Sequence, residues 1–170
     1  MKYNNLFIFD LDGVLIESRE LHYETLNDAL ASIDDKYVIT RDEHLSTYDG
    51  LSTTTKLKML SVNKGLSPEF FDKIWQDKQK HTFERLKQFN RSPKLIEICE
   101  WLKSKNYRIA VASNSIRETI KISLMSLGIM EYVEYIMSNE DVRRTKPYPE
   151  MYWNCMNAMN AIPRTTIIAE

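Results

Sequence analysis

Two aspartates spaced two residues apart carry the clearest chemistry in the sequence. Asp10 and Asp12 directly follow the apolar run of residues 6–9 and precede Gly13. Residues two apart in an extended chain point the same way, so both carboxylates can face one pocket. Close carboxylates repel unless a cation lies between them, and oxygen ligands without a thiol or imidazole favour Mg²⁺. A plain strand-to-turn signal, in which Asp and Gly are common, is the alternative interpretation.

Polar or acidic side chains also follow three further apolar runs of the sequence. They are Ser113 and Asn114 after residues 109–112, Ser138 and Asn139 after residues 133–137, and Glu170 after residues 165–169. In open parallel sheets, ligands bind beyond the carboxyl ends of the strands. The sequence therefore predicts that these groups share one edge of a sheet with Asp10 and Asp12.

The four apolar runs are predicted to be strands of a parallel sheet. Short continuous apolar runs bounded by turn residues are typical of strands buried on both faces. Apolar residues recur at helical spacing over residues 95–102, 116–127 and 151–159, which lie between or before the later runs. Helices that alternate with strands predict right-handed βαβ units, so the expected fold class is α/β with a Rossmann-like core.

Residues 16–89 differ from the rest of the chain because they contain no clear strand. The pattern predicts three or four helices, near residues 19–33, 40–47, 53–61 and 68–89. This segment is too long for a plain crossover between two neighbouring strands. We therefore expect an α/β core of residues 1–15 and 90–170, with an inserted helical domain of residues 16–89.

The composition is that of an ordinary soluble globular protein. The chain has 170 residues, 43% of them hydrophobic, with 23 Lys+Arg against 24 Asp+Glu. A net charge of −1 offers no broad field for nucleic acid or an anionic membrane, and Asp10 and Asp12 interrupt the N-terminal apolar run. Cys99 and Cys155 share no metal-ligand spacing, so we expect buried thiols. The expected location is cytoplasmic, with no nucleic-acid or membrane partner.

Three motifs in order resemble the haloacid dehalogenase superfamily. They are Phe9-Asp10-Leu11-Asp12-Gly13-Val14-Leu15, then Ser113-Asn114-Ser115, then Lys146-Pro147 with Pro149. The resemblance is to the branch of phosphatases and beta-phosphoglucomutase-like enzymes, which carries a helical (C1-type) cap between the first two motifs. Each motif alone is a weak signal, but three in this order are specific. Residues 16–89 lie where that branch has its cap.

The resemblance implies chemistry through an aspartyl-phosphate intermediate. Asp10 matches the family nucleophile, which also binds Mg²⁺. Asp12 matches the general acid and base, and its backbone carbonyl is a further metal ligand in the family. Ser113 matches the hydroxyl that binds the transferring phosphoryl group, and Lys146 the cation that holds it. An acid at the position of Asp12 favours phosphate esters, because dehalogenases of this fold generally lack one there.

The helical domain is expected to select the substrate. His22 lies where mutase-like members keep a hinge histidine, although an exposed helix face is the alternative. The loop around Gly50 resembles the cap loop that reaches over the active site. Beta-phosphoglucomutases place an arginine at about the position of Thr53, so its absence favours a monophosphate hydrolase. The predicted substrate-binding residues are Gly13, His22, Gly50, Leu51, Ser52 and Asn114.

The end of the sequence departs from the family pattern. Family members continue past the fourth strand with a second acidic residue, a helix and a further strand, whereas this sequence ends at Glu170. Glu170 matches the first acid of that motif and joins Asp10 and Asp12 as a predicted metal ligand. We expect the C-terminal part of the core to be missing and the chain to be a fragment of a longer gene product. Completion by another chain and a degenerate, non-catalytic relative are the alternatives.

The sequence therefore predicts a Mg²⁺-dependent phosphatase, a phosphoric monoester hydrolase acting on a small phosphorylated metabolite. A sugar phosphomutase and a non-catalytic protein that binds a phosphorylated ligand are the alternative functions. The full-length protein is expected to be a monomer. A truncated chain would expose an edge of its sheet, through which it could dimerise. The 170-residue chain is expected to be inactive if the fourth motif is incomplete.

Overall fold

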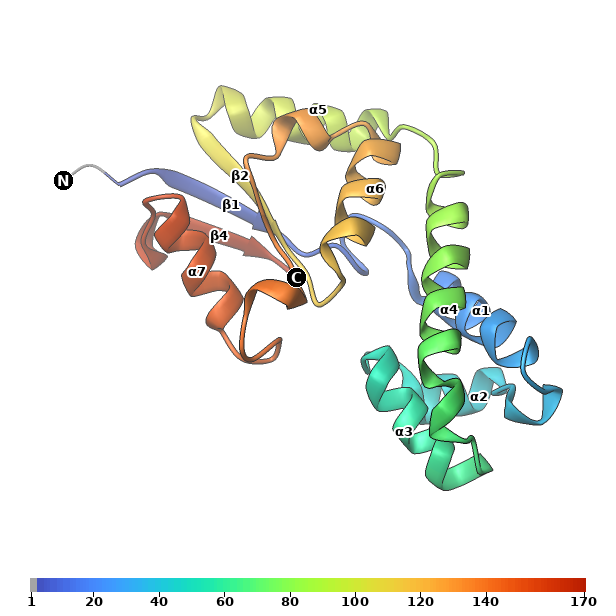
Figure 1. Cartoon of the computed structure of the whole chain (residues 1–170). Helices are drawn as coiled ribbons and strands as arrows, with labels where there is room; N and C mark the ends of the chain where they lie inside the picture. The colour runs from blue at the N-terminus through green and yellow to red at the C-terminus, as the bar shows by residue number, and fades with distance from the viewer. Residues whose placement is uncertain (1–2) are drawn as a thin grey trace. The chain divides into compact units, whose positions relative to one another are not determined.

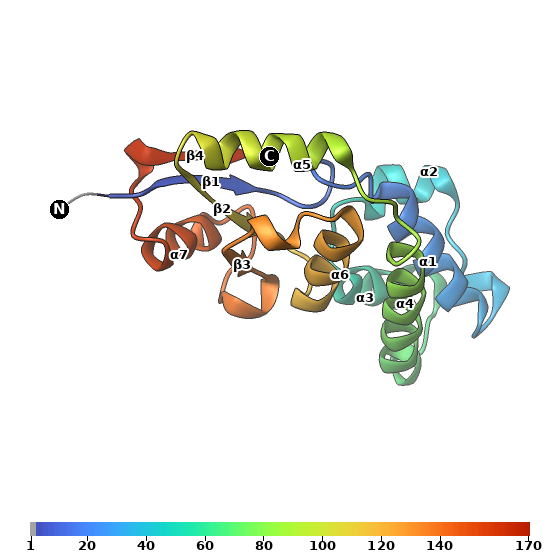
Figure 2. The same ribbon diagram turned by 90° about the horizontal axis from the view of Figure 1, so that it is seen from above.

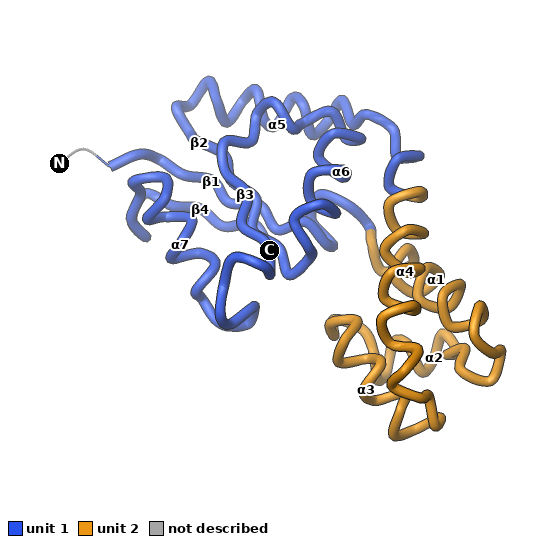
Figure 3. The backbone as a smooth tube through the Cα atoms, viewed as in Figure 1, with its two compact units in different colours: residues 1–17, 86–170 blue, residues 18–85 orange. Residues whose placement is uncertain are grey.

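The computed structural model describes residues 3–170, and the chain divides into two compact units. The first comprises Met1–Glu17 and Leu86–Glu170, and the second comprises Ser18–Arg85 (Figure 3). The first unit is an α/β unit and the second is helical. The expected fold class, a parallel-sheet core interrupted by a helical insert, is confirmed.

Four parallel strands form the sheet of the α/β unit, in the order β3-β2-β1-β4. Figure 1 labels β2, β1 and β4, and Figure 2 labels all four strands. Their bounds are Asn5–Phe9 for β1, Tyr107–Ala112 for β2, Tyr135–Met137 for β3 and Thr166–Ala169 for β4. The chain proceeds from β1 outward to β2 and β3, then crosses back to the far side of β1. This reversal places a topological switch point between β1 and β4, where open sheets form ligand crevices.

Helices cover both faces of this sheet. They are α5 (Pro93–Ser104), α6 (Arg117–Leu127) and α7 (Glu150–Ala158). Right-handed crossovers into β2 and β3 place α5 and α6 on one face, and the return crossover places α7 on the other. Figure 2 shows α5 and α7 on opposite sides of the strands. None of the helices within residues 3–170 combines the length and apolar character that crossing a bilayer requires.

The ends of two of these helices follow from local sequence. The Ser92 hydroxyl accepts a hydrogen bond from the Leu95 N–H at the start of α5, and Pro93 occupies the first helical position. Gly128 ends α6 with φ +74°, a left-handed conformation that favours glycine. Both signals are visible in the sequence, and the structure confirms both.

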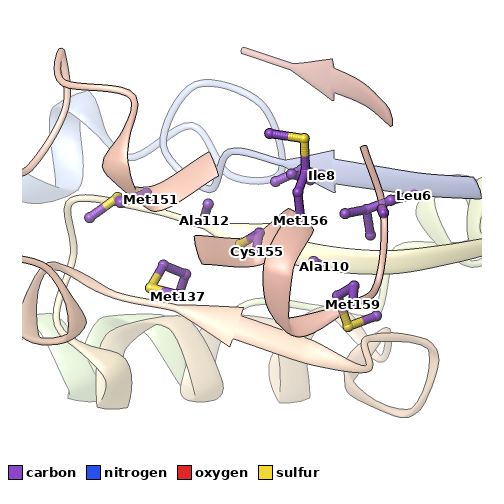
Figure 4. Close-up of a cluster of buried hydrophobic side chains, with 10 residues drawn as sticks. Leu6, Ile8, Ala110, Ala112, Met137, Met151, Cys155, Met156 and Met159 are labelled. Atoms are coloured by element: carbon purple, nitrogen blue, oxygen red, sulfur yellow. The ribbon is translucent and has the colours of Figure 1, made fainter. Parts of the chain in front are cut away.

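The core between the sheet and α7 combines small and sulfur-containing side chains (Figure 4). Ala110 and Ala112 on β2 leave room for α7, whose Met151 and Cys155 are completely buried. Flexible methionines fill irregular gaps of this kind well. Burial raises the pKa of the Cys155 thiol to about 12 and that of Cys99 to about 11, so both remain protonated at neutral pH. The expectation of buried free thiols is confirmed.

Two strands differ from their predicted form. The third strand begins at Tyr135 rather than at residue 133, because Met130–Tyr132 forms a 3₁₀ turn just before it. The fourth strand is not buried on both faces, since Ile167 and Ile168 are 45% and 41% exposed. Periodicity detects an apolar strand, but it does not show whether other elements cover that strand.

The second unit is a helical bundle with its own apolar core. Its elements are α1 (Arg19–Ala31), 3₁₀ turns Asp35–Tyr37 and Pro68–Phe70, α2 (Arg41–Glu43), a π-helical turn His44–Tyr48, α3 (Thr53–Lys64) and α4 (Phe71–Leu86). The predicted helix 40–47 is therefore split. The Asp49 N–H donates to the His44 carbonyl five residues earlier at 2.8 Å, which is the π-helical pattern.

Buried His44 lies beside the loop that joins this π-helical turn to α3. The His44 side chain is only 2% exposed, and its Nε2 lies 3.7 Å from Asp49 Oδ1. Asp49 also forms an ion pair with Arg19 at 3.0 Å. Burial lowers the pKa of His44, as do the charges of Lys56 and Arg19, against the opposing effects of Asp49 and Glu20. His44 is therefore neutral in the folded unit at neutral pH.

Replacing a buried core residue should cost far more stability than replacing its exposed neighbour in the sheet. Ile8 is completely buried, while its register partner Ile168 is 41% exposed. We expect Ile8→Ala to lower the free energy of unfolding by about 2–5 kcal/mol. The matched variant Ile168→Ala should lower it by about 1 kcal/mol or less. Urea denaturation followed by circular dichroism measures both, and equal losses would contradict this packing.

The stability of the helical unit should fall in mild acid because of His44. Its folded pKa lies below the ordinary value of 6.5, so the unfolded chain binds more protons. Stability is therefore complete above about pH 6.5 and is lost as the pH falls toward the folded pKa. His44→Gln should flatten this slope in thermal melts between pH 7 and pH 5, because it removes the titrating group. The control His81→Gln, at a half-exposed histidine, should retain the slope.

Candidate active site

Asp10 lies at the switch point, directly after β1. Its backbone N–H donates to the Ala169 carbonyl at 2.9 Å and so continues the pairing of β1 with β4. Its side chain is 16% exposed. Asp10 Oδ1 accepts a hydrogen bond from the Leu11 N–H at 2.7 Å and lies 3.0 Å from Lys146 Nζ. The carboxylate is thus fixed where the sheet topology favours ligand binding.

Lys146 brings two carboxylates together. Its Nζ lies 3.0 Å from Asp10 Oδ1 and 3.4 Å from Glu170 Oε1, and its side chain is 11% exposed. Both polar atoms of the Asn114 side chain bind the Lys146 backbone: Oδ1 accepts from its N–H at 3.0 Å and Nδ2 donates to its carbonyl at 3.3 Å. Asn114, at the end of β2, therefore positions the loop that carries Lys146.

Asp12 is held by the loop that follows β2. Its Oδ2 accepts hydrogen bonds from the hydroxyls of Ser115 at 3.0 Å and Ser113 at 3.3 Å. Ser113 is completely buried. Gly13 turns the chain after Asp12 with φ +83°, and its N–H donates to the Ile16 carbonyl at 2.8 Å. A residue with a side chain would be strained at this φ, which explains the glycine.

The charges of the site depend on one another. Burial raises the pKa of Asp10, against the lowering effects of Lys146 and the Leu11 N–H. Burial alone would lower the pKa of Lys146, but interactions with Tyr152 and Asp10 outweigh it and raise that pKa. A hydrogen bond from Tyr152 and the charge of Lys146 lower the pKa of Glu170. Lys146 is therefore a permanent cation at neutral pH.

Two residues of the site are absent from the set predicted by the motifs. The Tyr152 hydroxyl, on α7, donates to Glu170 Oε1 at 2.8 Å, and its ring centroid lies 5.2 Å from Lys146 Nζ. Burial raises the pKa of Tyr152 to about 12, so the hydroxyl remains a donor. No sequence signal separates Tyr152 from an ordinary aromatic residue of an amphipathic helix. Ser115 belongs to the second motif, and this position is the sequence signal that could have identified it as a site residue.

The site offers the type of ligand atom that a divalent metal ion such as Mg²⁺ prefers. Asp10, Asp12 and Glu170 offer only carboxylate oxygens, the ligands that Mg²⁺ prefers. Within residues 3–170, however, no three or more His, Cys, Asp or Glu side chains are grouped closely enough to hold a metal ion. The Lys146 ammonium lies beside both Asp10 and Glu170. Metal binding by these residues stays a prediction.

The other predicted substrate-binding residues belong to the helical unit. His22 lies on α1, and Gly50 adopts φ +72° in the loop before α3. Leu51 is 38% exposed, and the Ser52 hydroxyl caps α3 by accepting a hydrogen bond from the Thr55 N–H at 3.2 Å. Ser52 therefore serves as the N-cap of α3. Contact of these four residues with a substrate stays a prediction.

Comparison with known proteins supports the resemblance of the motifs. A family model described as haloacid dehalogenase-like hydrolase matches residues 7–170. A phosphorylated carbohydrates phosphatase from Thermotoga maritima is 27% identical over 168 residues, covering 96% of this chain and 74% of the relative. Pyrophosphatase PpaX from Bacillus mycoides is 23% identical over 169 residues, covering 99% of this chain and 74% of the relative.

Solved structures share the fold at low sequence identity. CbbY from Rhodobacter sphaeroides, in complex with xylulose-1,5-bisphosphate, aligns with TM-score 0.84 and 18% identity over 97% of this chain and 76% of its own. A beta-phosphoglucomutase from Clostridium difficile aligns with TM-score 0.80 and 22% identity over 98% of this chain and 76% of its own. With the family model matching residues 7–170 and the motif residues Asp10, Asp12, Ser113 and Lys146 gathered at one edge of the sheet, the chain belongs to the haloacid dehalogenase-like hydrolases.

Proposed function

We propose that this protein is a Mg²⁺-dependent phosphatase that hydrolyses a small phosphorylated metabolite through an aspartyl-phosphate intermediate. The observation that carries this proposal is the Asp10–Lys146 pair, 3.0 Å apart at the switch point of the sheet. A carboxylate beside a fixed cation is suited to attack a phosphoryl group, whose negative oxygens the cation attracts. Membership of a hydrolase family and the phosphatase names of its relatives support the same chemistry.

The reaction divides into two displacements at phosphorus. In the first, a carboxylate oxygen of Asp10 forms a bond to phosphorus, the bond from phosphorus to the ester oxygen breaks, and Asp12 protonates that oxygen. In the second, Asp12 takes a proton from a water molecule whose oxygen forms a bond to phosphorus. The bond between phosphorus and the Asp10 oxygen breaks, which releases inorganic phosphate and restores the Asp10 carboxylate. Lys146 holds the negative phosphoryl oxygens in both steps, with the Ser113 hydroxyl as a hydrogen-bond donor.

We assign the metal to the carboxylate side of the site. Asp10, the backbone carbonyl of Asp12 and the carboxylate of Glu170 would hold Mg²⁺. When bound, the cation neutralises charge on the phosphoryl oxygens. Tyr152 supports this assignment because its hydrogen bond holds one oxygen of Glu170 and stabilises its charged form.

The helical unit is proposed to select the substrate as a cap. Gly50, Leu51 and Ser52 form its candidate loop, and His22 on α1 is the candidate hinge residue. Sugar phosphomutase is the second candidate function, because a beta-phosphoglucomutase is among the structural neighbours. Thr53, the first residue of α3, is uncharged where mutases of this branch place an arginine, which favours hydrolysis of a monophosphate.

Loss of the nucleophile should abolish hydrolysis. We expect the protein encoded by the complete gene to release p-nitrophenol from p-nitrophenyl phosphate with Mg²⁺ and to lose this activity in EDTA. Asp10→Asn should reduce it below detection, because the amide cannot form the aspartyl phosphate. The control Asp35→Asn changes an exposed aspartate of the helical unit and should retain full activity. Activity that survives in Asp10→Asn would disprove the assignment.

Loss of the general acid should depend on the leaving group. Asp12→Asn should lower kcat/KM for an alkyl phosphate by roughly 10²–10⁴-fold, because an alkoxide leaves poorly without a proton. The quantity compared is kcat/KM because it reports the steps up to formation of the aspartyl phosphate, whereas the second step, in which Asp12 acts as base, is the same for every ester. The loss for p-nitrophenyl phosphate should be much smaller, because p-nitrophenolate is a stable anion. Steady-state assays with both esters measure the ratio of the loss on the alkyl phosphate to the loss on p-nitrophenyl phosphate. Equal losses on the two esters would argue against Asp12 as the acid.

A further inference from the structure

The carboxylate of Asp12 is held by two neighbouring serines. The Ser115 hydroxyl donates to Asp12 Oδ2 at 3.0 Å, and the Ser113 hydroxyl donates to the same oxygen at 3.3 Å. The two serines are themselves joined, because the Ser115 N–H donates to Ser113 Oγ at 3.0 Å. All three side chains therefore belong to one hydrogen-bonded cluster, in which Ser115 makes the shorter contact with Asp12.

The backbone of Ser115 is fixed from both sides. Its carbonyl accepts a hydrogen bond from the Asn139 N–H at 3.3 Å, which ties it to the loop after β3. Two residues later, the Arg117 N–H donates to Glu140 at 2.7 Å, and the Arg117 guanidinium forms an ion pair with Asp141 at 2.6 Å. The start of α6 is thus anchored to the end of β3. A hydroxyl on such a segment is preorganised rather than mobile.

Ser113 and Ser115 differ in what they can do during the reaction. A hydroxyl carries one proton, so it donates one full hydrogen bond at a time. Ser113 is proposed above to donate to the transferring phosphoryl group, and in doing so it no longer donates to Asp12. Of the two hydroxyls, Ser115 then holds the Asp12 carboxylate.

We infer that Ser115 is a positioning residue that orients Asp12, so that the proton is delivered from Oδ1. This inference rests on the proposed function, in which Asp12 is the general acid. Because Oδ2 accepts the Ser115 hydroxyl proton, the neutral acid carries its own proton on Oδ1. The Oδ1–H bond breaks as the proton joins the leaving oxygen, which keeps the electron pair of the broken bond to phosphorus. A carboxyl free to rotate would spend time with the wrong oxygen toward the ester.

The kinetic test compares two esters in matched variants of the protein encoded by the complete gene. Ser115→Ala should lower kcat/KM, which reports formation of the aspartyl phosphate, by about 10-fold to 100-fold for an alkyl phosphate and by no more than about threefold for p-nitrophenyl phosphate. Ser115→Thr keeps the hydroxyl and should restore the alkyl phosphatase rate. Ser123→Ala is the control, because Ser123 lies on α6 with its hydroxyl bonded to the Thr119 carbonyl. It should leave both rates unchanged. Equal losses on both esters in Ser115→Ala, or no loss on either, would overturn the inference.

A structural test on the 170-residue chain is independent of turnover. Crystal structures of the unchanged chain, Ser115→Ala and Ser115→Thr, each with inorganic phosphate bound so that the Ser113 hydroxyl donates to it rather than to Asp12, would be compared at the Asp12 side chain. We expect Asp12 to turn or to occupy two positions in Ser115→Ala and to keep one position in Ser115→Thr. An unchanged Asp12 in Ser115→Ala would overturn the inference even if every variant hydrolyses phosphate esters. Activity retained in Asp10→Asn would instead disprove Asp10 as the nucleophile. The losses that Ser115→Ala causes on the two esters, compared with each other, would still test the role of Ser115.

Discussion

The site depends on the ion pair between Asp10 and Lys146. A carboxylate that is only 16% exposed loses much of its hydration, and its charge is tolerable only beside a compensating cation. That cation must come from a distant part of the chain and must itself be held in place. Asn114 does this by binding both polar groups of the Lys146 backbone. The Asp10–Lys146 ion pair therefore requires that the loop before α7 lie close to the carboxyl ends of β1 and β2.

The crossover to β4 brings a second carboxylate, that of Glu170, to the Asp10–Lys146 ion pair. Because β4 pairs with β1, Glu170 reaches Lys146 at 3.4 Å, and Tyr152 on α7 reaches Glu170 at 2.8 Å. Asp10 and Glu170 therefore both lie beside the Lys146 ammonium group. Two carboxylates around one cation leave an excess of negative charge at this end of the sheet.

Both units contain a loop whose conformation is fixed by local contacts or backbone geometry. In the α/β unit, Gly13 turns the chain directly after Asp12 with φ +83°. The helical unit has its own apolar core, and the ion pair of Asp49 with Arg19 joins the loop before α3 to the start of α1. Each unit therefore presents a defined loop on a rigid base, which is the usual way in which proteins display functional residues.

The sequence by itself determined the parallel sheet, the helical insert and the motif residues Asp10, Asp12, Ser113 and Lys146, because these depend on local spacing and on residue type. Only the tertiary structure decided that Asn114 binds the Lys146 backbone, that Tyr152 reaches Glu170 and that Ser115 holds Asp12. These contacts join residues that lie 18 to 103 positions apart. They arise from the order of the strands and the hand of the crossovers, which bring separate loops to one edge of the sheet.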